Sequence, residues 1–291
     1  MQVAGSTSPD FTQKGPFKPH KAVQGTRFRA TCGQAPGCDQ AVNLSLTVTV
    51  PSSAPEQPHG SFPIVFLFNG FKMRASFYKQ YAEHLSSWGC SVLQYDHKFW
   101  HTPADASEVQ FLDQLIDWVA QQNDTPNTPL SGLVDISKIA VAGHSRGGKL
   151  AALHLAGNPR VKTAFLIDPV DSTTYVPPSP QNPSAVQALA GLGKRAGMVA
   201  AGITCSCNPA GSNYQKFFGV LGSGSWLAVI LQASHQEFLN APLLNWVFNH
   251  VICPPAGSSS HQVTMALTSA PLLRHISGLR LVLRPWPSGW Q

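Results

Sequence analysis

Hydrophobic and polar residues alternate along the first strongly patterned stretch of the chain. From Leu44 to Val50, apolar side chains at every second position are separated by Ser and Thr. A period of two is typical of a strand that buries one face, so a strand is predicted over 42–50. A shorter and more polar strand is expected before it, over 21–31.

The later runs are apolar at successive positions, which is typical of central parallel strands covered on both faces. Strands of this kind are predicted at 63–68, 90–95, 139–142, 161–167, 197–204 and 226–231. Helical patterns are predicted at 74–88, from Thr102-Pro103 to Val119, at 149–156 and, after a loop that starts at 233, up to about His250. This alternation predicts an α/β domain with one doubly wound, mostly parallel sheet, an antiparallel start and helices on both faces.

The strand at 139–142 runs into Gly143-His144-Ser145-Arg146-Gly147, and a helix follows. Gly-x-Ser-x-Gly between a strand and a helix is the pattern of a nucleophile elbow, which favours the α/β-hydrolase fold. In so tight a turn, side chains at 143 and 147 would collide with neighbouring backbone. Ser145 is therefore the candidate nucleophile, and the Arg146 N–H at the helix N-terminus is a candidate oxyanion donor. The alternative is a serine in an ordinary glycine-rich turn.

A serine nucleophile needs a histidine base and a carboxylate, and in this fold they follow the serine in the order acid, then histidine. Asp168 is the favoured acid because it ends the strand at 161–167, at the edge where functional residues gather. Asp171 is the alternative, three residues further into the loop. Either aspartate could instead be a turn residue beside Pro169.

His235 is the favoured base because it follows the strand at 226–231 directly. The other candidates after the acid lie late on a helix or in the tail, at His250, His261 and His275. Glu237 is interpreted as an acid at a helix start. His144 neighbours the nucleophile on a strained turn and points away from it, so a packing or polar supporting role is expected.

Bulky apolar residues occupy the loops at the same sheet edge. Phe71, just past Asn69-Gly70, is the candidate for the second oxyanion N–H, unless it is a plain hydrophobic loop residue. The candidate substrate wall also includes Met73, Phe77, Phe99 and Trp100. Each alone is more typical of a core, but together they suit a large apolar ester better than a sugar or a peptide.

Composition changes this picture little. The chain has 291 residues, of which 43% are hydrophobic and 12% charged, so it can bury a large core. Its net charge of +6 is spread along the chain, and we expect no nucleic-acid partner because no basic run or stripe occurs. Peripheral contact with an anionic membrane surface is a hypothesis, and no apolar run is long enough to span a bilayer.

Three segments are expected: a flexible N-terminal segment over 1–20, the α/β domain over 21–253, and a C-terminal tail of uncertain structure over 254–291. The cysteines are at positions 32, 38, 90, 205, 207 and 253. Their spacing gives no convincing zinc pattern, so mostly free thiols are expected, with Cys90 a small core residue. A local Cys32–Cys38 disulfide is a hypothesis.

Several stretches resemble chlorophyllases: 69–80, 84–89, 141–149, 167–171 and, more loosely, 208–218. The resemblance covers roughly 21–250, and Gly-His-Ser-Arg-Gly-Gly is its most specific part. Asn69-Gly70 stands where plant members usually have His-Gly, and the surroundings of His235 differ from the Gly-His-Met-Asp of those members. The tail beyond Cys253 matches no segment of the family that we can place. These departures point to an algal or otherwise divergent member.

The resemblance implies hydrolysis of the phytyl ester of chlorophyll to chlorophyllide and phytol, without a metal or other cofactor. It also implies Ser145 as nucleophile, Asp168 as acid and His235 as base, and a chloroplast location with thylakoid association. The alternative function is a general lipase or carboxylesterase that acts on other apolar esters. A third class is an inactive hydrolase fold that only binds pigment.

Overall fold

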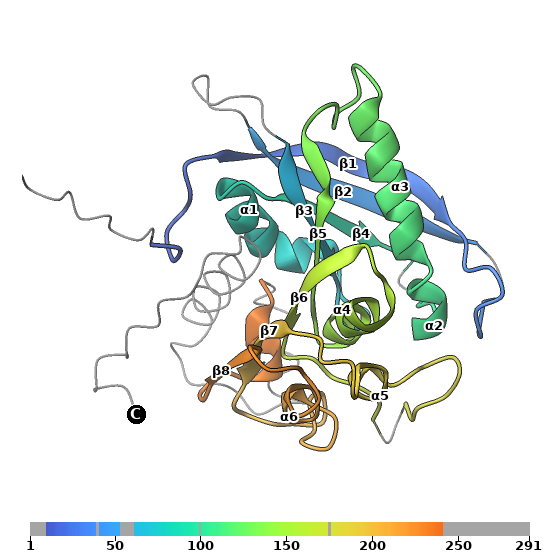
Figure 1. Ribbon diagram of the computed structural model, residues 1–291, viewed down its shortest axis with the longest axis vertical. Coiled ribbons are helices and arrows are strands. Elements are labelled where there is room, and N and C mark those ends of the chain that lie inside the picture. The colour runs from blue at the N-terminus through green and yellow to red at the C-terminus, as the bar shows by residue number, and fades with distance from the viewer. Residues whose placement is uncertain (1–9, 39–40, 53–60, 99, 174–175, 241–291) are drawn as a thin grey trace, which may run out of the picture.

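The structure, a computed structural model, describes residues 10–38, 41–52, 61–98, 100–173 and 176–240. One twisted sheet runs through the molecule in the order β1-β2-β4-β3-β5-β6-β7-β8 (Figure 1). Its strands are β1 Lys18–Ala30, β2 Val42–Ser52, β3 Phe62–Phe68, β4 Ser91–Asp96, β5 Val134–His144, β6 Val161–Ile167, β7 Ala196–Ala201 and β8 Trp226–Ile230.

The sheet is mixed, with its antiparallel part at the start of the chain. β2 runs antiparallel to both β1 and β4, whereas every pairing from β4 through β3 to β8 is parallel. The predicted mostly parallel sheet with an antiparallel start is therefore confirmed. Because parallel strands end at the same edge, the loops after β3, β4, β5, β6, β7 and β8 gather there.

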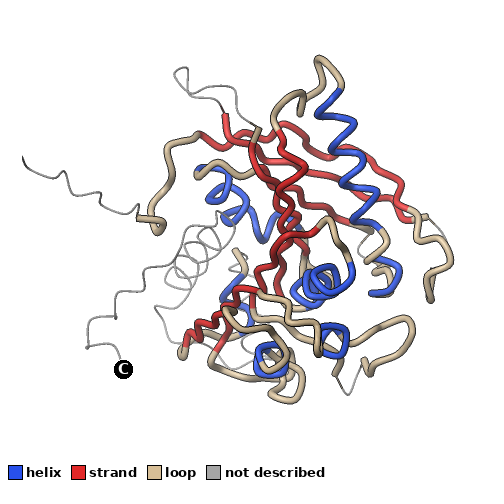
Figure 2. The backbone as a smooth tube through the Cα atoms, viewed as in Figure 1, coloured by secondary structure: helices blue, strands red, loops and turns tan. Residues whose placement is uncertain are grey.

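Helices cover both faces of the sheet, as Figure 2 shows. They are α1 Lys79–Ser87, α2 Asp105–Glu108, α3 Phe111–Asp124, α4 Arg146–Gly157, α5 Ala185–Leu189 and α6 Tyr214–Phe218, with 3-10 turns η1 Ala75–Tyr78 and η2 His235–Phe238. One core lies between the sheet and α3, α4, α5 and α6. The other lies between the sheet and η1, α1 and η2.

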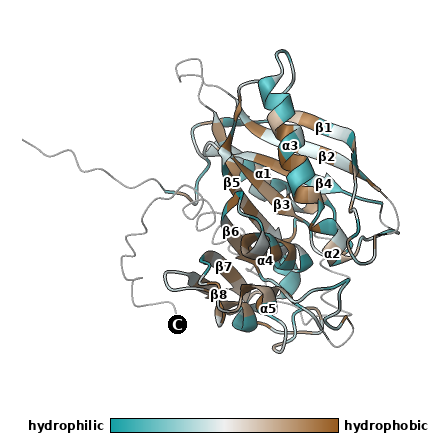
Figure 3. Cartoon of the chain, turned by 45° about the vertical axis from the view of Figure 1, so that its right-hand side comes forward, coloured by the Kyte–Doolittle hydropathy of each residue, from teal (hydrophilic) through white to brown (hydrophobic). Residues whose placement is uncertain are grey.

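The two cores explain why β3 is apolar at nearly every position. Ile64 and Phe66 pack into the core beneath α3 and α4, whereas Val65 and Leu67 pack into the core beneath α1. Full burial of such a side chain contributes about 1.5–3 kcal/mol. The strands at the centre of the sheet are accordingly hydrophobic, while α3 alternates between hydrophobic and hydrophilic bands (Figure 3).

The structure describes part of the N-terminal segment over 1–20, from residue 10 onwards. Phe11 is buried and packs edge-to-face on Trp88, and the Trp88 indole N–H donates to the Gln13 carbonyl. The His84 ring also lies 2.9 Å from the Phe11 carbonyl, so this part of the segment packs on α1 and its C-terminal end. Residues 1–9, the end of the helix expected up to His250 and the tail over 254–291 lie outside the described residues.

The helix expected to open at Thr102-Pro103 begins later. α2 starts at Asp105 and ends at Glu108, and α3 starts separately at Phe111. The Pro103 carbonyl accepts from the Arg146 guanidinium 2.9 Å away instead of entering a helix.

Two short helices, α5 and α6, lie in segments where the sequence predicted no helix. Ser184 caps α5 by accepting from the Gln187 N–H, and Asn213 caps α6 by accepting from the Gln215 N–H. Ser184-Ala-Val-Gln187 has the spacing of a capping box, a signal that could have located α5.

The cysteines are paired more than expected. The hypothetical Cys32–Cys38 disulfide is present, and Cys205 is also disulfide-bonded. Cys90 is a free, buried core thiol as predicted, and Cys207 is free and partly buried. The expectation of mostly free thiols was wrong, because spacing along the chain does not show which segments the fold brings together.

Candidate active site

Ser145 occupies a strained turn between β5 and α4. Its φ of 58° and ψ of −122° lie in a region that non-glycine residues rarely adopt, at a cost of about 1–3 kcal/mol. The Ser145 N–H donates to the Ile167 carbonyl at 3.0 Å, and its carbonyl accepts from the Lys149 and Val170 N–H groups. Bonds to β6 and α4 thus hold the turn.

Both glycines of the elbow are required by close backbone approach. A Cβ at Gly143 would press on the carbonyl of Gly147, and a Cβ at Gly147 would press on the carbonyl of Phe68. The tight turn predicted from the sequence is therefore present.

The structure brings Ser145, His235 and Asp168 together. His235 Nε2 lies 2.9 Å from Ser145 Oγ, and His235 Nδ1 lies 2.6 Å from Asp168 Oδ2. Asp168 is fully buried and His235 is 2% exposed. In this geometry a neutral imidazole can take the serine proton while the carboxylate holds its tautomer.

The Asp168 carboxylate is held from several sides. Asp168 has a φ of 38°, so, like Ser145, it has a positive φ that residues other than glycine rarely adopt. Its N–H donates to the Val199 carbonyl at 2.7 Å, and Oδ1 accepts from the Ala201 N–H at 3.0 Å. Oδ2 accepts from the Asn208 amide at 3.1 Å as well as from His235. A buried carboxylate requires such donors.

The alternative acid, Asp171, is engaged elsewhere. Its carboxylate accepts from the Ser184 hydroxyl at 2.5 Å and from the Ala185 N–H at 2.9 Å, at the start of α5. Lys149 Nζ lies 3.9 Å away. The structure therefore places Asp168, and not Asp171, against the His235 ring.

His144 supports the site, as expected. Burial, followed by the charge of neighbouring His235, holds the pKa of His144 well below its usual value, so its ring is neutral. The Tyr78 hydroxyl accepts from the Gly70 N–H at 2.9 Å and can therefore donate to His144 Nδ1 at 3.0 Å. That leaves His144 Nε2–H to donate to the His235 carbonyl at 3.0 Å. This chain of bonds links the loop after β3 to the histidine.

A pocket of about 420 Å³ opens beside Ser145. Its lining is formed by Phe71, Thr102, Pro103, Ala104, Asp105, Ser145, Arg146, Lys149, Val170, Asp171, Thr173, Val176, Asn182 and Cys207. Phe71 is 54% exposed, and Arg146 begins α4, where the first N–H groups have no intrahelical acceptor. The two candidate oxyanion residues thus border the same pocket as the serine.

The rest of the expected wall is different. Met73 and Phe77 are partly buried against the core beneath α1, and neither lines this pocket. Trp100 is 89% exposed and also does not line it. Phe99 lies outside the described residues. Of the apolar wall predicted from the sequence, only Phe71 lines the pocket among the residues that the structure describes.

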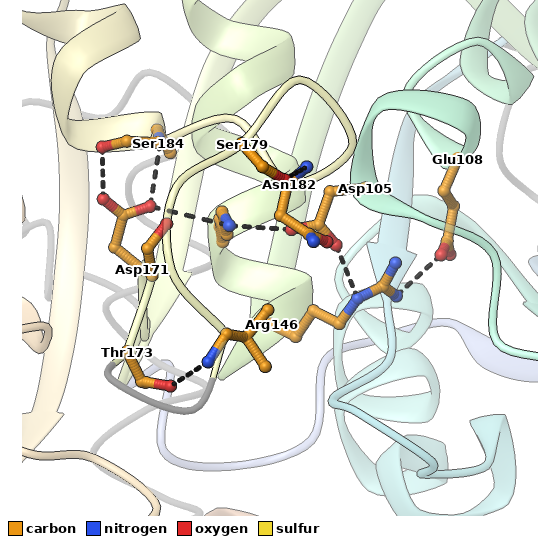
Figure 4. Close-up of polar contacts among 12 residues, drawn as sticks. Asp105, Glu108, Arg146, Asp171, Thr173, Ser179, Asn182 and Ser184 are labelled. Carbon is orange, nitrogen blue, oxygen red and sulfur yellow. Dashed lines mark hydrogen bonds and ion pairs between the residues drawn. The ribbon is translucent and has the colours of Figure 1, made fainter. Parts of the chain in front are cut away.

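A buried chain of charged side chains forms one side of the pocket, and no pattern in the sequence indicated it. The Arg146 guanidinium lies 2.7 Å from both Asp105 and Glu108, and Lys149 Nζ lies 2.7 Å from the other oxygen of Asp105. Figure 4 shows Arg146 pointing to both acids, with Asp171 and Ser184 at the far end of the chain. This chain of charged side chains connects α2, α4 and the loop after β6.

Within the described ranges, no group of three or more His, Cys, Asp or Glu side chains is arranged to hold a metal ion. In the same part of the chain, no helix is both long and apolar enough to cross a membrane.

Comparison with known proteins identifies relatives. The chain is 29% identical over 201 residues to Chlorophyllase-2 of Arabidopsis thaliana, a region that spans 62% of each protein. It is 24% identical over 286 residues to the Citrus unshiu protein named Chlorophyllase-1, chloroplastic, covering 90% of this chain and 83% of the relative. It is 26% identical over 219 residues to Chlorophyllase-1 of Arabidopsis thaliana, covering 67% of each.

The family model described as Chlorophyllase matches residues 34–269, which is most of the chain. The matched range contains the elbow at Ser145 and both of its hydrogen-bonded partners, Asp168 and His235. The chain therefore belongs to the chlorophyllase family of carboxylic ester hydrolases.

Proposed function

We propose that this protein is a serine esterase that hydrolyses the phytyl ester of chlorophyll to chlorophyllide and phytol. The observation that carries the proposal is the position of His235, hydrogen-bonded to Ser145 on one side and to Asp168 on the other. Family membership supports the choice of substrate. Membership and the geometry of these three residues are independent arguments for the same reaction.

The proposed reaction has two steps. His235 Nε2 takes the Ser145 proton as Oγ attacks the ester carbonyl that links phytol to the propionyl side chain of the chlorin. The tetrahedral intermediate collapses, His235 protonates the leaving phytol oxygen, and an acyl-enzyme remains on Ser145. Water, deprotonated by the same histidine, then attacks the acyl-enzyme and releases chlorophyllide.

The backbone N–H groups of Phe71 and Arg146 are the proposed donors to the oxyanion. Both residues border the pocket beside Ser145. A single donor of this kind contributes about 2.7–4 kcal/mol of transition-state stabilisation. The neutral His144 and Tyr78 would act at a distance, because their bonds fix the Phe71 loop relative to His235.

The fold is proposed to be that of the α/β hydrolases. The strand order, the elbow between β5 and α4, and the acid and histidine at the ends of β6 and β8 all support this assignment. Contact with a membrane surface and a chloroplast location with thylakoid association are proposed with the function. The location is supported by the name of the Citrus relative.

Incubation with chlorophyll a, followed by separation of the pigments, tests the proposal. We expect chlorophyllide from the wild type and none from Ser145→Ala of unchanged circular dichroism. Hydrolysis of short nitrophenyl esters with none of chlorophyll or pheophytin would favour a general carboxylesterase instead. Failure of a fluorophosphonate to label Ser145 would favour an inactive pigment-binding protein.

A further inference from the structure

A buried asparagine lies behind the proposed acid of the triad. Asn208 is in the loop between β7 and α6 and is fully buried. The loop is fastened next to it, because Cys205 is disulfide-bonded and the Asn213 amide donates to the Asn208 carbonyl at 3.3 Å. Its side chain is therefore held in one place by the surrounding structure.

The Asn208 side-chain amide is satisfied at both atoms. Nδ2 donates to Asp168 Oδ2 at 3.1 Å and to the Ile203 carbonyl at 3.2 Å, and Oδ1 accepts from the Cys205 N–H at 2.8 Å. Exchanging Oδ1 and Nδ2 would set the amide oxygen against two acceptors, Asp168 Oδ2 and the Ile203 carbonyl, and the amide nitrogen against a donor, the Cys205 N–H. The partners therefore fix the orientation of the amide.

Asn208 and His235 share one carboxylate oxygen. Asp168 Oδ2 accepts from His235 Nδ1 at 2.6 Å and from the Asn208 amide, whereas Oδ1 accepts from the Ala201 N–H. Backbone thus holds one oxygen, and a side chain holds the one that faces the histidine. Without the amide, the carboxylate could rotate about its Cβ–Cγ bond and carry the hydrogen bond to His235 out of line.

We infer that Asn208 is a positioning residue of the triad, which fixes the Asp168 carboxylate and moderates its charge towards His235. The inference rests on the proposed function. Asn208 touches neither Ser145 nor the substrate pocket, so it acts through Asp168.

The charge effect has a definite sign. A donated hydrogen bond withdraws negative charge from Oδ2, so its loss favours the imidazolium form of His235, which cannot act as a base. The acid limb of the pH profile of kcat/KM should then move to higher pH. The elements around the site carry other ionisable side chains, none of which is replaced in the variants: His144, Arg146, Lys149, Asp171, Cys207 and Glu237.

The test compares Asn208→Ala and Asn208→Leu with the matched control Asn213→Ala. Asn213 is also fully buried in this loop and bonds Asn208 and Gln215, but its side chain does not contact Asp168. Turnover of chlorophyll a by full-length protein is measured against pH, with circular dichroism to monitor folding. Asn208→Leu keeps a similar side-chain size and removes the donor without adding charge, so it also serves if Asn208→Ala does not fold.

For Asn208→Ala we expect kcat to fall about tenfold to a hundredfold, the range for one hydrogen bond to a charged group, with KM within about twofold. The acid limb should move upwards in both Asn208 variants, because neither new side chain donates to Asp168. Asn213→Ala should keep the wild-type limb.

The inference is overturned if either folded Asn208 variant has the kcat and pH profile of the control. Loss of the proposed function itself gives a different result, because then the wild type would not release chlorophyllide or Ser145→Ala would still do so.

Discussion

Replacing the Arg146 side chain tests whether the buried ion pairs beside the pocket stabilise the fold. In the fold, Nε and Nη1 lie 2.7 Å from Asp105 and Glu108, and Nη2 donates to the Pro103 carbonyl at 2.9 Å. Burial disfavours the charged guanidinium, but Glu108 and Asp105 outweigh it, so the pKa of Arg146 is raised above its ordinary value. The guanidinium therefore stays charged where its side chain is only 13% exposed.

Arg146→Met fills similar space and leaves two nearly buried carboxylates without their shared cation. Breaking a buried pair in this way costs about 3–5 kcal/mol. Lys149 still pairs with Asp105, and Tyr95 still donates to Glu108 at 2.7 Å, so we expect a loss near the lower end of that range.

The matched control is Arg160→Met. Arg160 lies 2.7 Å from Asp117, but the side chains are 35% and 69% exposed, and such a pair contributes about 0–1 kcal/mol. The free energy of unfolding is measured by urea titration, in which the ionic strength stays low. Equal decreases in the free energy of unfolding of the two variants, at equal m-values, would refute the argument that the ion pairs of Arg146 stabilise the fold.

Three further predictions concern the site and its surroundings. Asp168→Asn should lower kcat for chlorophyll by about 10⁴-fold, because His235 would lose the carboxylate that holds its tautomer. Asp171→Asn should keep most of the wild-type kcat. The reverse result would reassign the acid to Asp171. Tyr78→Phe removes the hydroxyl between Gly70 and His144 and should lower kcat several-fold. The control Tyr81→Phe, which loses a hydrogen bond to the Phe238 carbonyl, should keep the wild-type kcat. Equal kcat values in the two variants would contradict the supporting role of Tyr78. Burial lowers the pKa of His154 from 6.5 to about 3, so its unfolded form alone binds a proton between those values, and stability falls as the pH drops below 6.5. The free energy of unfolding should therefore be about 2 kcal/mol lower at pH 5 than above pH 6.5, and urea titrations should show a smaller decrease in His154→Leu. The same decrease in wild type and His154→Leu would contradict this assignment.

Much of the arrangement could be predicted because parallel strands end at one edge of a sheet. Ser145 and Asp168 directly follow β5 and β6, and His235 follows β8 after a short loop, so their meeting point depends mainly on strand order. The same reasoning predicted the two-sided burial of β3.

The pocket wall could not be predicted in the same way. Met73 and Phe77 lie in the right segment, but they pack against the core beneath α1 and do not line the pocket. The partners of Arg146 come from α2, which is far away in the sequence, and nothing in the local pattern marks them as neighbours. Side-chain direction in loops and pairing between distant charges depend on tertiary contacts.

The turnover of chlorophyll a by the wild type and by Ser145→Ala, under identical conditions, tests the central claim most directly. The account predicts that the wild type releases chlorophyllide and phytol in equal amounts, and that the folded Ser145→Ala protein releases neither. Chlorophyllide formation by the Ser145→Ala protein at a rate near that of the wild type would contradict it.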